Sequence, residues 1–520
     1  MLAKLSTGLQ LWSWPDYGKD NGLARDVFKN AASVLRQPLR GRPQRLFFTR
    51  LGVLTTARLA LKACIETGAT RINQPPQAAQ ILACCLMMIE LTTSSEVVTG
   101  ADLLVHQLSN DNAMAHVDFR ADLLRSLAIF ERNHQLLGKK PWLVDLEQEF
   151  IRATGLSPRQ FVKLCLVAGA AYRSMNAGSL ITDDPTFLID KKRFANVAVD
   201  DDSLSAFSRI VAQTPQELAE FLPTQEPRPL ADTTVFQTWP MIRVANQEQY
   251  YCLDVAGLLD KTGRGLYWTL FTAADAGTKA KLGGTYGLAF EAYLHDRVET
   301  GQFEVDRYFK NPKFANGDEA CDAIFVDGSG LVFCEYKSSV LRADAKLSGR
   351  LDRLVPQIGK KFVTGDDEGR KGIAQLNQSI RRFLQGEEIN GIPNRKWKLI
   401  LPVMICLETS MLCPGMSGFL NSRFDRAPLK ALSSIRIGPL VLIDIEHFEA
   451  LLPDIKQYGF AKLLDDYYRT HMRKIPDQLV AFKRKNIPFL HDKPEPADET
   501  DAAFRRFFSE MGDRLFNEAI

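Results

Sequence analysis

The stretch CDAIFVDGSGLVFCEYKSS, residues 321–339, decides the fold of its surroundings. Two runs of β-branched and aromatic residues, 323–326 and 331–336, flank an Asp-Gly-Ser-Gly segment that favours a tight β-hairpin turn. A loop that closes symmetrically on Gly328 and Ser329 places Asp322 directly opposite Glu335. The sequence therefore predicts a hairpin with two carboxylates facing each other at its open end.

The charged end of this hairpin needs compensation. Lys337 shares the face of Asp322 and Glu335, because strand side chains alternate. Both faces of the strands are otherwise apolar, which predicts a sheet covered on both sides. Two carboxylates at the end of a buried sheet repel each other and lose hydration, and Mg²⁺ or Mn²⁺ is a natural counter-ion for such oxygen ligands. The alternative is a surface hairpin with an ordinary Asp, Glu and Lys in water.

A third acid lies upstream, in TYGLAFEAYLHDRVET (285–300), which has helical composition and follows Gly283-Gly284. At 100° per residue, Glu291 falls on the apolar stripe of this expected helix. The neighbours on that stripe are Leu288, Leu294, His295 and Val298. Buried acids rarely lack a partner, although a glutamate at the stripe's edge can also reach solvent. No histidine has zinc-site spacing, and His295, one turn after Glu291, is the one to examine.

This arrangement resembles the PD-(D/E)XK nuclease superfamily, which has the restriction-endonuclease-like fold. Its members carry an acid on a helix, an Asp on a strand, and Glu-x-Lys or Asp-x-Lys on the following strand. The matching positions are Glu291, Asp322 and Glu335-Tyr336-Lys337. The proline that often precedes the Asp is Cys321 here, a departure that leaves the ligands intact. The resemblance covers about residues 235–450.

The resemblance implies a Mg²⁺ (or Mn²⁺) ion held by Asp322, Glu335 and the carbonyl of Tyr336. Glu291 would hold a metal-bound water or help to fix a second ion, and Lys337 would orient the attacking water and stabilise developing charge. Gln375, in a helix expected over 371–383, is carried over on resemblance alone, because it lies away from that helix's apolar arc. Two apolar runs, 398–407 and 439–445, are expected to be buried strands that complete the sheet.

The charge distribution is compatible with a polyanionic substrate. The net charge of +3 implies no particular partner, but residues 337–400 hold 14 Lys and Arg against 7 Asp and Glu. Residues 1–50 hold 9 basic residues against 3 acidic ones. Such stretches can hold a phosphate backbone or can be solvated faces. Residues 181–232, with 10 acidic and 5 basic residues, are not expected to form a nucleic-acid surface.

Length and composition bound the class of protein. A chain of 520 residues that is 45% hydrophobic is globular, with two to four domains. We expect no membrane span, because no run approaches about 18 apolar residues, and no secretion signal. Nine cysteines without a C-x-x-C spacing indicate buried thiols in a reducing cytoplasm. No P-loop motif is present.

The expected fold is α/β: a restriction-endonuclease-like core, with a mixed sheet flanked by helices, over residues 233–450. A mainly α-helical recognition or regulatory region (1–232) precedes it, and a helical extension (451–520) follows. Helical spacing occurs in the N-terminal region at 50–67, 76–91, 120–137, 143–153 and 157–173. The acidic, Pro-rich stretch 200–232 is expected to be a linker, 236–254 a hairpin, and 502–516 an amphipathic helix.

The leading hypothesis is a metal-dependent endonuclease, with DNA favoured over RNA as its substrate. By analogy alone, host defence against phage is a plausible setting. The helical region would contact the substrate, a protein partner or a second copy of the chain. One alternative is a nucleic-acid-binding or scaffold protein whose nuclease-like core no longer cuts. Another is that residues 1–230 sense an effector that releases the nuclease.

Overall fold

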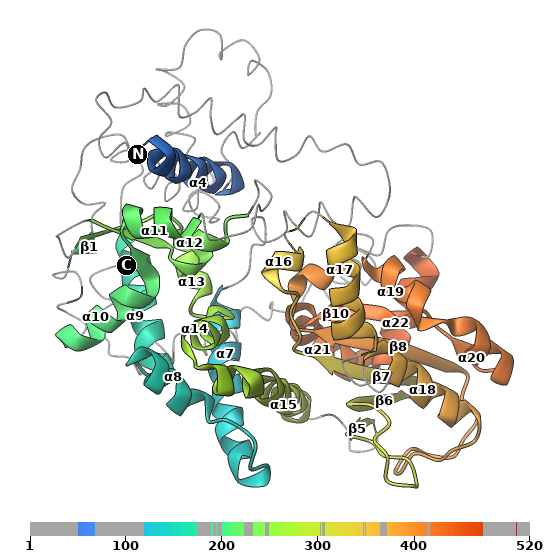
Figure 1. Cartoon of the computed structure of the whole chain (residues 1–520). Coiled ribbons are helices and arrows are strands. Elements are labelled where there is room, and N and C mark those ends of the chain that lie inside the picture. The colour runs from blue at the N-terminus through green and yellow to red at the C-terminus, as the bar shows by residue number, and fades with distance from the viewer. Residues whose placement is uncertain are drawn as a thin grey trace.

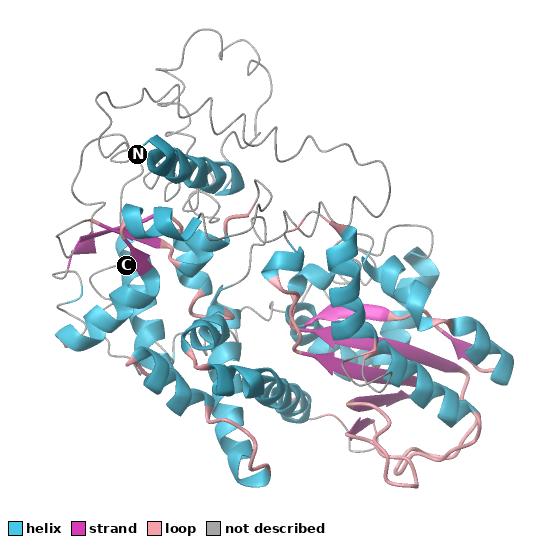
Figure 2. Ribbon diagram, viewed as in Figure 1, coloured by secondary structure: helices cyan, strands magenta, loops and turns pink. Residues whose placement is uncertain are grey.

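The computed structural model describes a large part of the chain as two sheets surrounded by helices, an α/β fold (Figures 1 and 2). The described residues are 50–67, 119–173, 189–190, 194, 200–222, 232–244, 249–301, 303, 307–346, 348, 350–364, 372–412, 416–471 and 506. Within these ranges, no helix is both long enough and apolar enough to cross a membrane.

The hairpin forms in the predicted register. Strands β6 (Ala323–Asp327) and β7 (Gly330–Lys337) are antiparallel and pair Asp327 with Gly330 and Ala323 with Cys334. The next pair outward in this register is Asp322 with Glu335. Gly328 has φ of +52°, a conformation that glycine adopts without strain, so the turn closes where its residues allow. The predicted opposition of the two acids is confirmed.

The hairpin lies in a mixed six-stranded sheet, in the order β10-β8-β7-β6-β5 with β9 paired to β8. Strand β7 is parallel to β8, and β8 is parallel to β10. Strand β6 is antiparallel to both of its neighbours, β5 and β7. The two expected apolar strands are confirmed as β8 and β10. Besides the hairpin strands β6 and β7, the sheet contains β5 (Tyr308–Lys310), β8 (Leu399–Cys406), β9 (Arg436–Ile437) and β10 (Val441–Asp444).

Both faces of this sheet are buried, as the two-sided apolar pattern predicts. The face with Ile324 and Phe333 packs in one core with helices on its side of the sheet (Figure 1). These helices are α17 (Leu351–Ile358), α18 (Ile373–Leu384), α19 (Met416–Phe424) and α20 (Arg426–Leu432). The face with Phe325 and Cys334 belongs to a second core. Its helices are α15 (Ala276–Thr300), α21 (Ile445–Tyr458) and α22 (Phe460–His471).

The expected N-terminal helices form wherever the structure describes them. They are α4 (Arg50–Thr67), α7 (Phe119–Leu136), α8 (Leu146–Thr154) and α9 (Pro158–Arg173). Ser157 caps α9 as its sequence suggests, because its hydroxyl accepts the Gln160 N–H at 3.1 Å. The helix expected at 76–91 lies outside the described residues, as does all of 502–516 except Arg506.

Two expectations in the middle of the chain are wrong. The stretch 200–232 begins with helices α10 (Asp201–Val211) and α11 (Pro215–Phe221) rather than a linker. Its acids and prolines serve as helix starts: the Asp200 carboxylate accepts the Ser203 N–H, and Pro215 follows a Thr214 capping box. In the expected hairpin 236–254, Phe236 lies instead in a short helix, α12 (Thr234–Thr238).

The remainder of that hairpin belongs to a second sheet. Strands β3 (Met241–Arg243) and β4 (Gln249–Cys252) are antiparallel, and the sheet order is β1-β4-β3-β2. The outer strands are β1 (Ile189–Asp190) and β2 (Ala212–Gln213). Two helices follow, α13 (Val255–Asp260) and α14 (Gly265–Ala273). The hairpin therefore belongs to a small sheet that packs with the N-terminal helices, and it does not extend the six-stranded sheet.

Helix α15 is longer than its sequence suggests. It begins at Ala276, where the Asp275 carboxylate caps it by accepting the Thr278 N–H, and it continues through Gly283-Gly284. The helix was expected to start after this pair, since each interior glycine costs about 1 kcal/mol. A Cβ at Gly284 would lie 3.3 Å from the Trp142 ring, so close packing favours glycine there.

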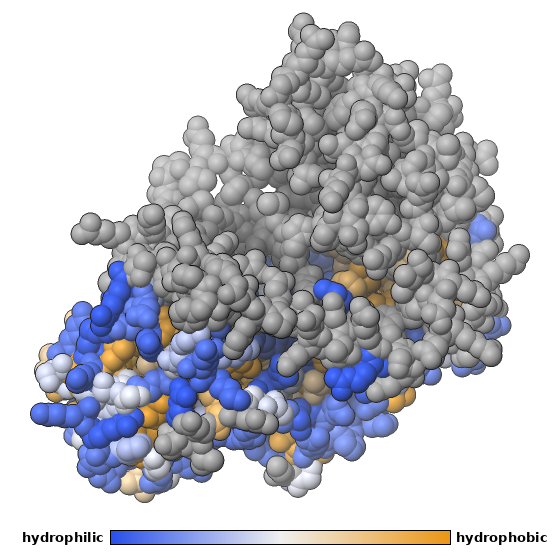
Figure 3. Space-filling model, turned by 180° about the vertical axis from the view of Figure 1, so that it is seen from behind, coloured by the Kyte–Doolittle hydropathy of each residue, from blue (hydrophilic) through white to orange (hydrophobic). Residues whose placement is uncertain are grey.

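Helix α15 also joins the helical part to the sheet, because helices α7 to α10 and one face of the sheet share a single core. Arg125 of α7 pairs with Glu449 of α21 at 2.8 Å across this contact. Five described cysteines are buried, as expected: Cys165, Cys252, Cys321, Cys334 and Cys406. Figure 3 shows that the described surface seen from behind is mostly hydrophilic, with scattered apolar patches.

Candidate metal and catalytic site

Asp322, Glu335 and Lys337 meet at the open end of the hairpin. Because β6 starts at Ala323, the Tyr336 N–H is available to a side chain, and it donates to Asp322 Oδ2 at 2.5 Å. Lys337 Nζ donates to Glu335 Oε1 at 2.6 Å. The Glu335 side chain is only 2% exposed and that of Lys337 is 14% exposed. The structure thus brings together the three residues that the hairpin register predicts.

Glu335 is the least satisfied group in this cluster. Its Oε1 accepts from Lys337 and, at 3.4 Å, from the backbone N–H of Gly372, which precedes α18. Its Oε2 is buried and has no hydrogen-bond partner among the described residues. Gly372 has φ of +70°, and a Cβ there would lie 2.3 Å from the Phe362 carbonyl oxygen. Glycine is therefore required where the chain approaches Glu335.

The electrostatics of the cluster reflect an excess of acid. Burial and the neighbouring Glu335 raise the pKa of Asp322 well above its usual value. Burial alone would lower the pKa of Lys337, but Glu335 and Asp322 outweigh it and raise that pKa, so the side chain stays an ammonium. A single cation thus faces two carboxylates, and repulsion between them remains.

Glu291 approaches from α15, on the other face of the sheet. Its side chain is 23% exposed, and its Oε1 lies 3.6 Å from Nε2 of the buried His295. Burial raises the pKa of Glu291, but the hydrogen bond and charge of His295 outweigh it and leave the pKa below its usual value. Glu291 also raises the pKa of Asp322, which places the two acids within electrostatic reach. Leu294, His295 and Val298 on the predicted stripe are buried.

Sequence reasoning missed Asn311, which connects these acids. Its Oδ1 lies 3.0 Å from His295 Nε2, its side chain helps to lower the pKa of Glu291, and its backbone N–H donates to the Asp322 carbonyl at 2.9 Å. Its φ of +44° is unusual outside glycine, and asparagine tolerates it better than most residues. Glu319 was also missed: burial, followed by Glu291 and Glu335, raises its pKa. Neither residue stands out in the sequence, because only folding brings them close.

Gln375 is not brought into the cluster. It lies half-buried in the first turn of α18, close in the chain to Gly372. Across the described ranges, no hydrogen bond or ion pair links Gln375 to Asp322, Glu335 or Lys337. The structure therefore adds no support for Gln375 beyond its position in the chain.

The donor set at the hairpin fits a divalent cation of the magnesium type. Asp322 directly precedes β6, and Glu335 and the Tyr336 carbonyl lie near the end of the neighbouring strand β7. Glu335 Oε2 is a buried acceptor that has no donor among the residues described. The described residues contain no cluster of three His, Cys, Asp or Glu side chains that could hold a metal. Mg²⁺ does not need one, because it is usually bound by one or two carboxylates and completes its shell with waters and substrate phosphates.

Comparison with known proteins gives no match to a family, a curated protein or a solved structure. The site must therefore be interpreted from its own geometry and charge.

Proposed function

We propose that the chain is a metal-dependent nuclease of the PD-(D/E)XK type, with Asp322, Glu335 and Lys337 at its centre. The observation that carries the proposal is Glu335 Oε2, a buried carboxylate oxygen that has no donor in the part of the chain that the structure describes; Lys337 is the cation bonded to the other oxygen of Glu335. Burying such a charge is costly unless something pairs with it. A divalent cation supplies that pair.

The six-stranded sheet supports the finer fold proposal, a restriction-endonuclease-like core. It is mixed, it is covered by helices on both faces, and it carries the Asp and the Glu-x-Lys on adjacent antiparallel strands. The third acid, Glu291, comes from the preceding helix α15. This combination of elements is the one that the resemblance implies.

The residues divide the work of phosphodiester hydrolysis. Water attacks phosphorus and gives up one proton to solvent, the bond to one ester oxygen breaks, and that oxygen takes a proton from solvent. Asp322, Glu335 and the Tyr336 carbonyl would hold a Mg²⁺ or Mn²⁺ ion, which lowers the pKa of bound water and offsets phosphate charge. Lys337, held by Glu335 at 2.6 Å, is positioned to donate to the phosphate as negative charge develops. Glu291, whose pKa is lowered by His295, would accept a hydrogen bond from a water at the site.

The test is an incubation of the full chain with plasmid, linear DNA, single-stranded DNA and RNA, in Mg²⁺, in Mn²⁺ and in EDTA. The wild type should cut at least one substrate, DNA in preference to RNA, and only with metal. Lys337→Ala should lower the rate by about 10²- to 10³-fold. Lys310→Ala, an exposed lysine on β5, is the matched control and should cut normally.

Cleavage that persists in EDTA, or that survives Lys337→Ala, would exclude this mechanism. Metal-independent nucleic-acid binding without any cleavage would instead support the alternative of a core that no longer cuts.

A further inference from the structure

A large cleft opens beside the hairpin, between the helical part and the six-stranded sheet. Its volume is about 2320 Å³, and its lining runs from Phe119 and Trp239 on the helical side to Lys337 at the end of β7. Pockets for small molecules usually measure about 300–1,000 Å³. The cleft is thus larger than one small ligand needs, and it reaches a residue of the proposed nuclease centre.

The wall on the sheet side is basic and lacks aromatic residues. We define the core wall as the described lining residues from 337–361 and 407–409, with seven Lys and Arg against three Asp and Glu. Because Lys337 is already bonded to Glu335 outside the wall, the surplus is three. Each of these acids already pairs with a base of the same wall: Asp344 with Arg342, Asp352 with Arg350, and Glu408 with Lys346. The wall therefore presents net positive charge along its length.

Among the described residues that line the cleft, the aromatic ones all lie on the opposite wall. We define the helical wall as the lining residues from 119–286, which include seven Phe, Tyr and Trp. Trp268 of α14 is 40% exposed and lies edge-on to Phe271 at 5.7 Å, while Tyr267 stacks on Phe271 at 6.0 Å. A supported, exposed tryptophan facing a cleft is a surface on which a flat ligand can stack.

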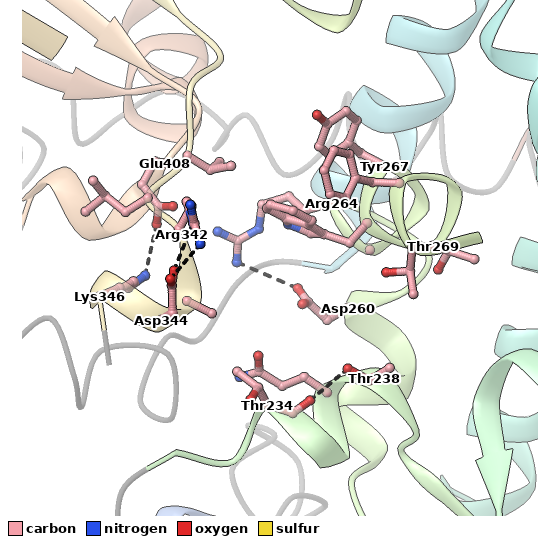
Figure 4. Close-up of a pocket in the computed structure, with 18 of the residues that line it drawn as sticks. Thr234, Thr238, Asp260, Arg264, Tyr267, Thr269, Arg342, Asp344, Lys346 and Glu408 are labelled. Atoms are coloured by element: carbon pink, nitrogen blue, oxygen red, sulfur yellow. Dashed lines mark hydrogen bonds and ion pairs between the residues drawn. The ribbon is translucent and has the colours of Figure 1, made fainter. Parts of the chain in front are cut away.

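Two cations of the helical wall lie deep in the cleft. Figure 4 shows Arg264, the residue before α14, pointing toward Arg342 of the core wall, and its Nη1 donates to Thr409 Oγ1 at 3.0 Å. Lys261 is only 7% exposed, and its ammonium makes no hydrogen bond or ion pair with the residues that the structure describes. A mostly buried lysine that lines the cleft and has no such partner among the described residues favours an anionic ligand beside it.

We propose that this cleft binds one unpaired strand of nucleic acid and leads it to the nuclease centre. The phosphates lie along the core wall, and the bases stack on the helical wall at Trp268. A basic groove combined with aromatic platforms is how proteins bind single strands, whose bases are accessible, whereas duplex bases are already paired and stacked. The claim that the strand is led to the nuclease centre rests on the proposed nuclease function. The claim that the cleft binds a single strand does not.

The binding is tested in EDTA, where a metal-dependent enzyme cannot cut. Fluorescence anisotropy of the full chain is measured with a labelled single-stranded DNA of about 20 nucleotides, the RNA of the same sequence and the blunt DNA duplex. The single strands should bind at least about tenfold more tightly than the duplex, and the tighter of the two identifies the polymer. Trp268→Ala should weaken single-strand binding by about 5- to 150-fold. Trp142→Ala is the matched control, because Trp142 is 46% exposed but does not line the cleft.

A second variant tests the core wall. Lys360→Ala with Lys361→Ala removes two positive charges and should reduce the slope of log affinity against log salt by about 1.4 for a single strand. Duplex binding as tight as single-strand binding, or unchanged affinity in both cleft variants, would overturn the inference. The two proposals fail separately. Single-strand binding without metal-dependent cleavage rejects the nuclease but retains the cleft, whereas cleavage that ignores Trp268 and the two lysines rejects only the cleft.

Discussion

Two buried charge clusters differ in how well their charges are balanced. In the first, which we call the balanced cluster, Asp122, Arg125 and Glu449 join α7 to α21. Every carboxylate oxygen there accepts a hydrogen bond: from Arg125, from the Arg264 N–H at 2.9 Å, or from the Tyr293 hydroxyl at 2.5 Å. In the second, the hairpin cluster of Asp322, Glu335 and Lys337, one carboxylate oxygen has no donor among the described residues.

The comparison of the two clusters shows that the burial of charge is not by itself a sign of function. Folded proteins bury ion pairs when every charge is compensated, and the balanced cluster meets that condition through two arginines and a tyrosine. The hairpin cluster does not meet it, since Lys337 faces both Asp322 and Glu335. The deficit, rather than the burial, is the ground on which we propose a bound cation and a catalytic role.

The largest expected contrast is in cleavage. Glu335→Gln should lower the rate on any substrate that the wild type cuts by at least about 10³-fold, because it removes both a metal ligand and the partner of Lys337. In EDTA the variant should be at least as stable as the wild type, because a source of repulsion is gone. Cleavage kinetics check the predicted rate, and urea unfolding checks the predicted stability. If Glu335→Gln is inactive because it is unfolded, the predicted difference between the hairpin cluster and the balanced cluster does not exist.

The balanced cluster should respond in the opposite sense. Glu449→Ala leaves Arg125 buried with one carboxylate partner fewer, and should lower the free energy of unfolding by about 3–5 kcal/mol. The rate per folded molecule should stay unchanged, since Glu449 lies outside the hairpin cluster. Urea titrations give the stability, and cleavage well below the unfolding transition gives the rate. A loss of stability below about 1 kcal/mol would show that this cluster is not structural.

Lys261 is a third buried charge, and it makes stability depend on pH. Burial lowers its pKa to about 8, against about 10.4 for an unfolded lysine. Between these values the unfolded chain binds more protons, so the stability of the folded state rises with pH through this window. Lys261→Met should therefore be more stable than the wild type by roughly 3 kcal/mol at pH 7, with the gap closing toward pH 10. A gap that is independent of pH would contradict this.

The smallest effect is expected at Gln375, which was assigned to the site by the family resemblance and has no described hydrogen bond to the hairpin cluster. Gln375→Ala should change the cleavage rate by no more than roughly twofold, because no hydrogen bond or ion pair among the described residues links this side chain to the hairpin cluster. The same assay as for Glu335→Gln applies. A loss near that of Lys337→Ala would mean that Gln375 contacts the substrate itself.

Local signals explain what the sequence predicts well. The hairpin register follows from the Asp-Gly-Ser-Gly turn and the flanking β-branched runs, and the two-sided apolar pattern anticipates both cores. Periodicity also places Glu291 on the stripe of α15 that faces the sheet. Each of these depends on residues close together in the chain.

Contacts between distant residues account for what the sequence does not reveal. The Gly372 N–H that meets Glu335 comes from 37 positions further along, and Arg125 pairs with Glu449 across 324 positions. The predicted start of α15, after Gly283-Gly284, was wrong. The Asp275 cap and the packing of Gly284 on Trp142 outweigh the low helix propensity of glycine. Asn311 adopts a backbone conformation that only the surrounding fold imposes.

The most direct test of the central claim is a calorimetric titration of the full chain with Mn²⁺, at a temperature where all variants are folded. The wild type should bind the ion, Glu335→Gln should not, and Glu449→Gln should bind it as the wild type does, because of the two clusters it is the hairpin cluster that has a carboxylate oxygen without a donor among the described residues. Binding should also stabilise the wild type, by about 2.7 kcal/mol at a hundred times the Kd. A wild type that takes up no Mn²⁺, or a Glu335→Gln variant that binds it equally well, would contradict the account.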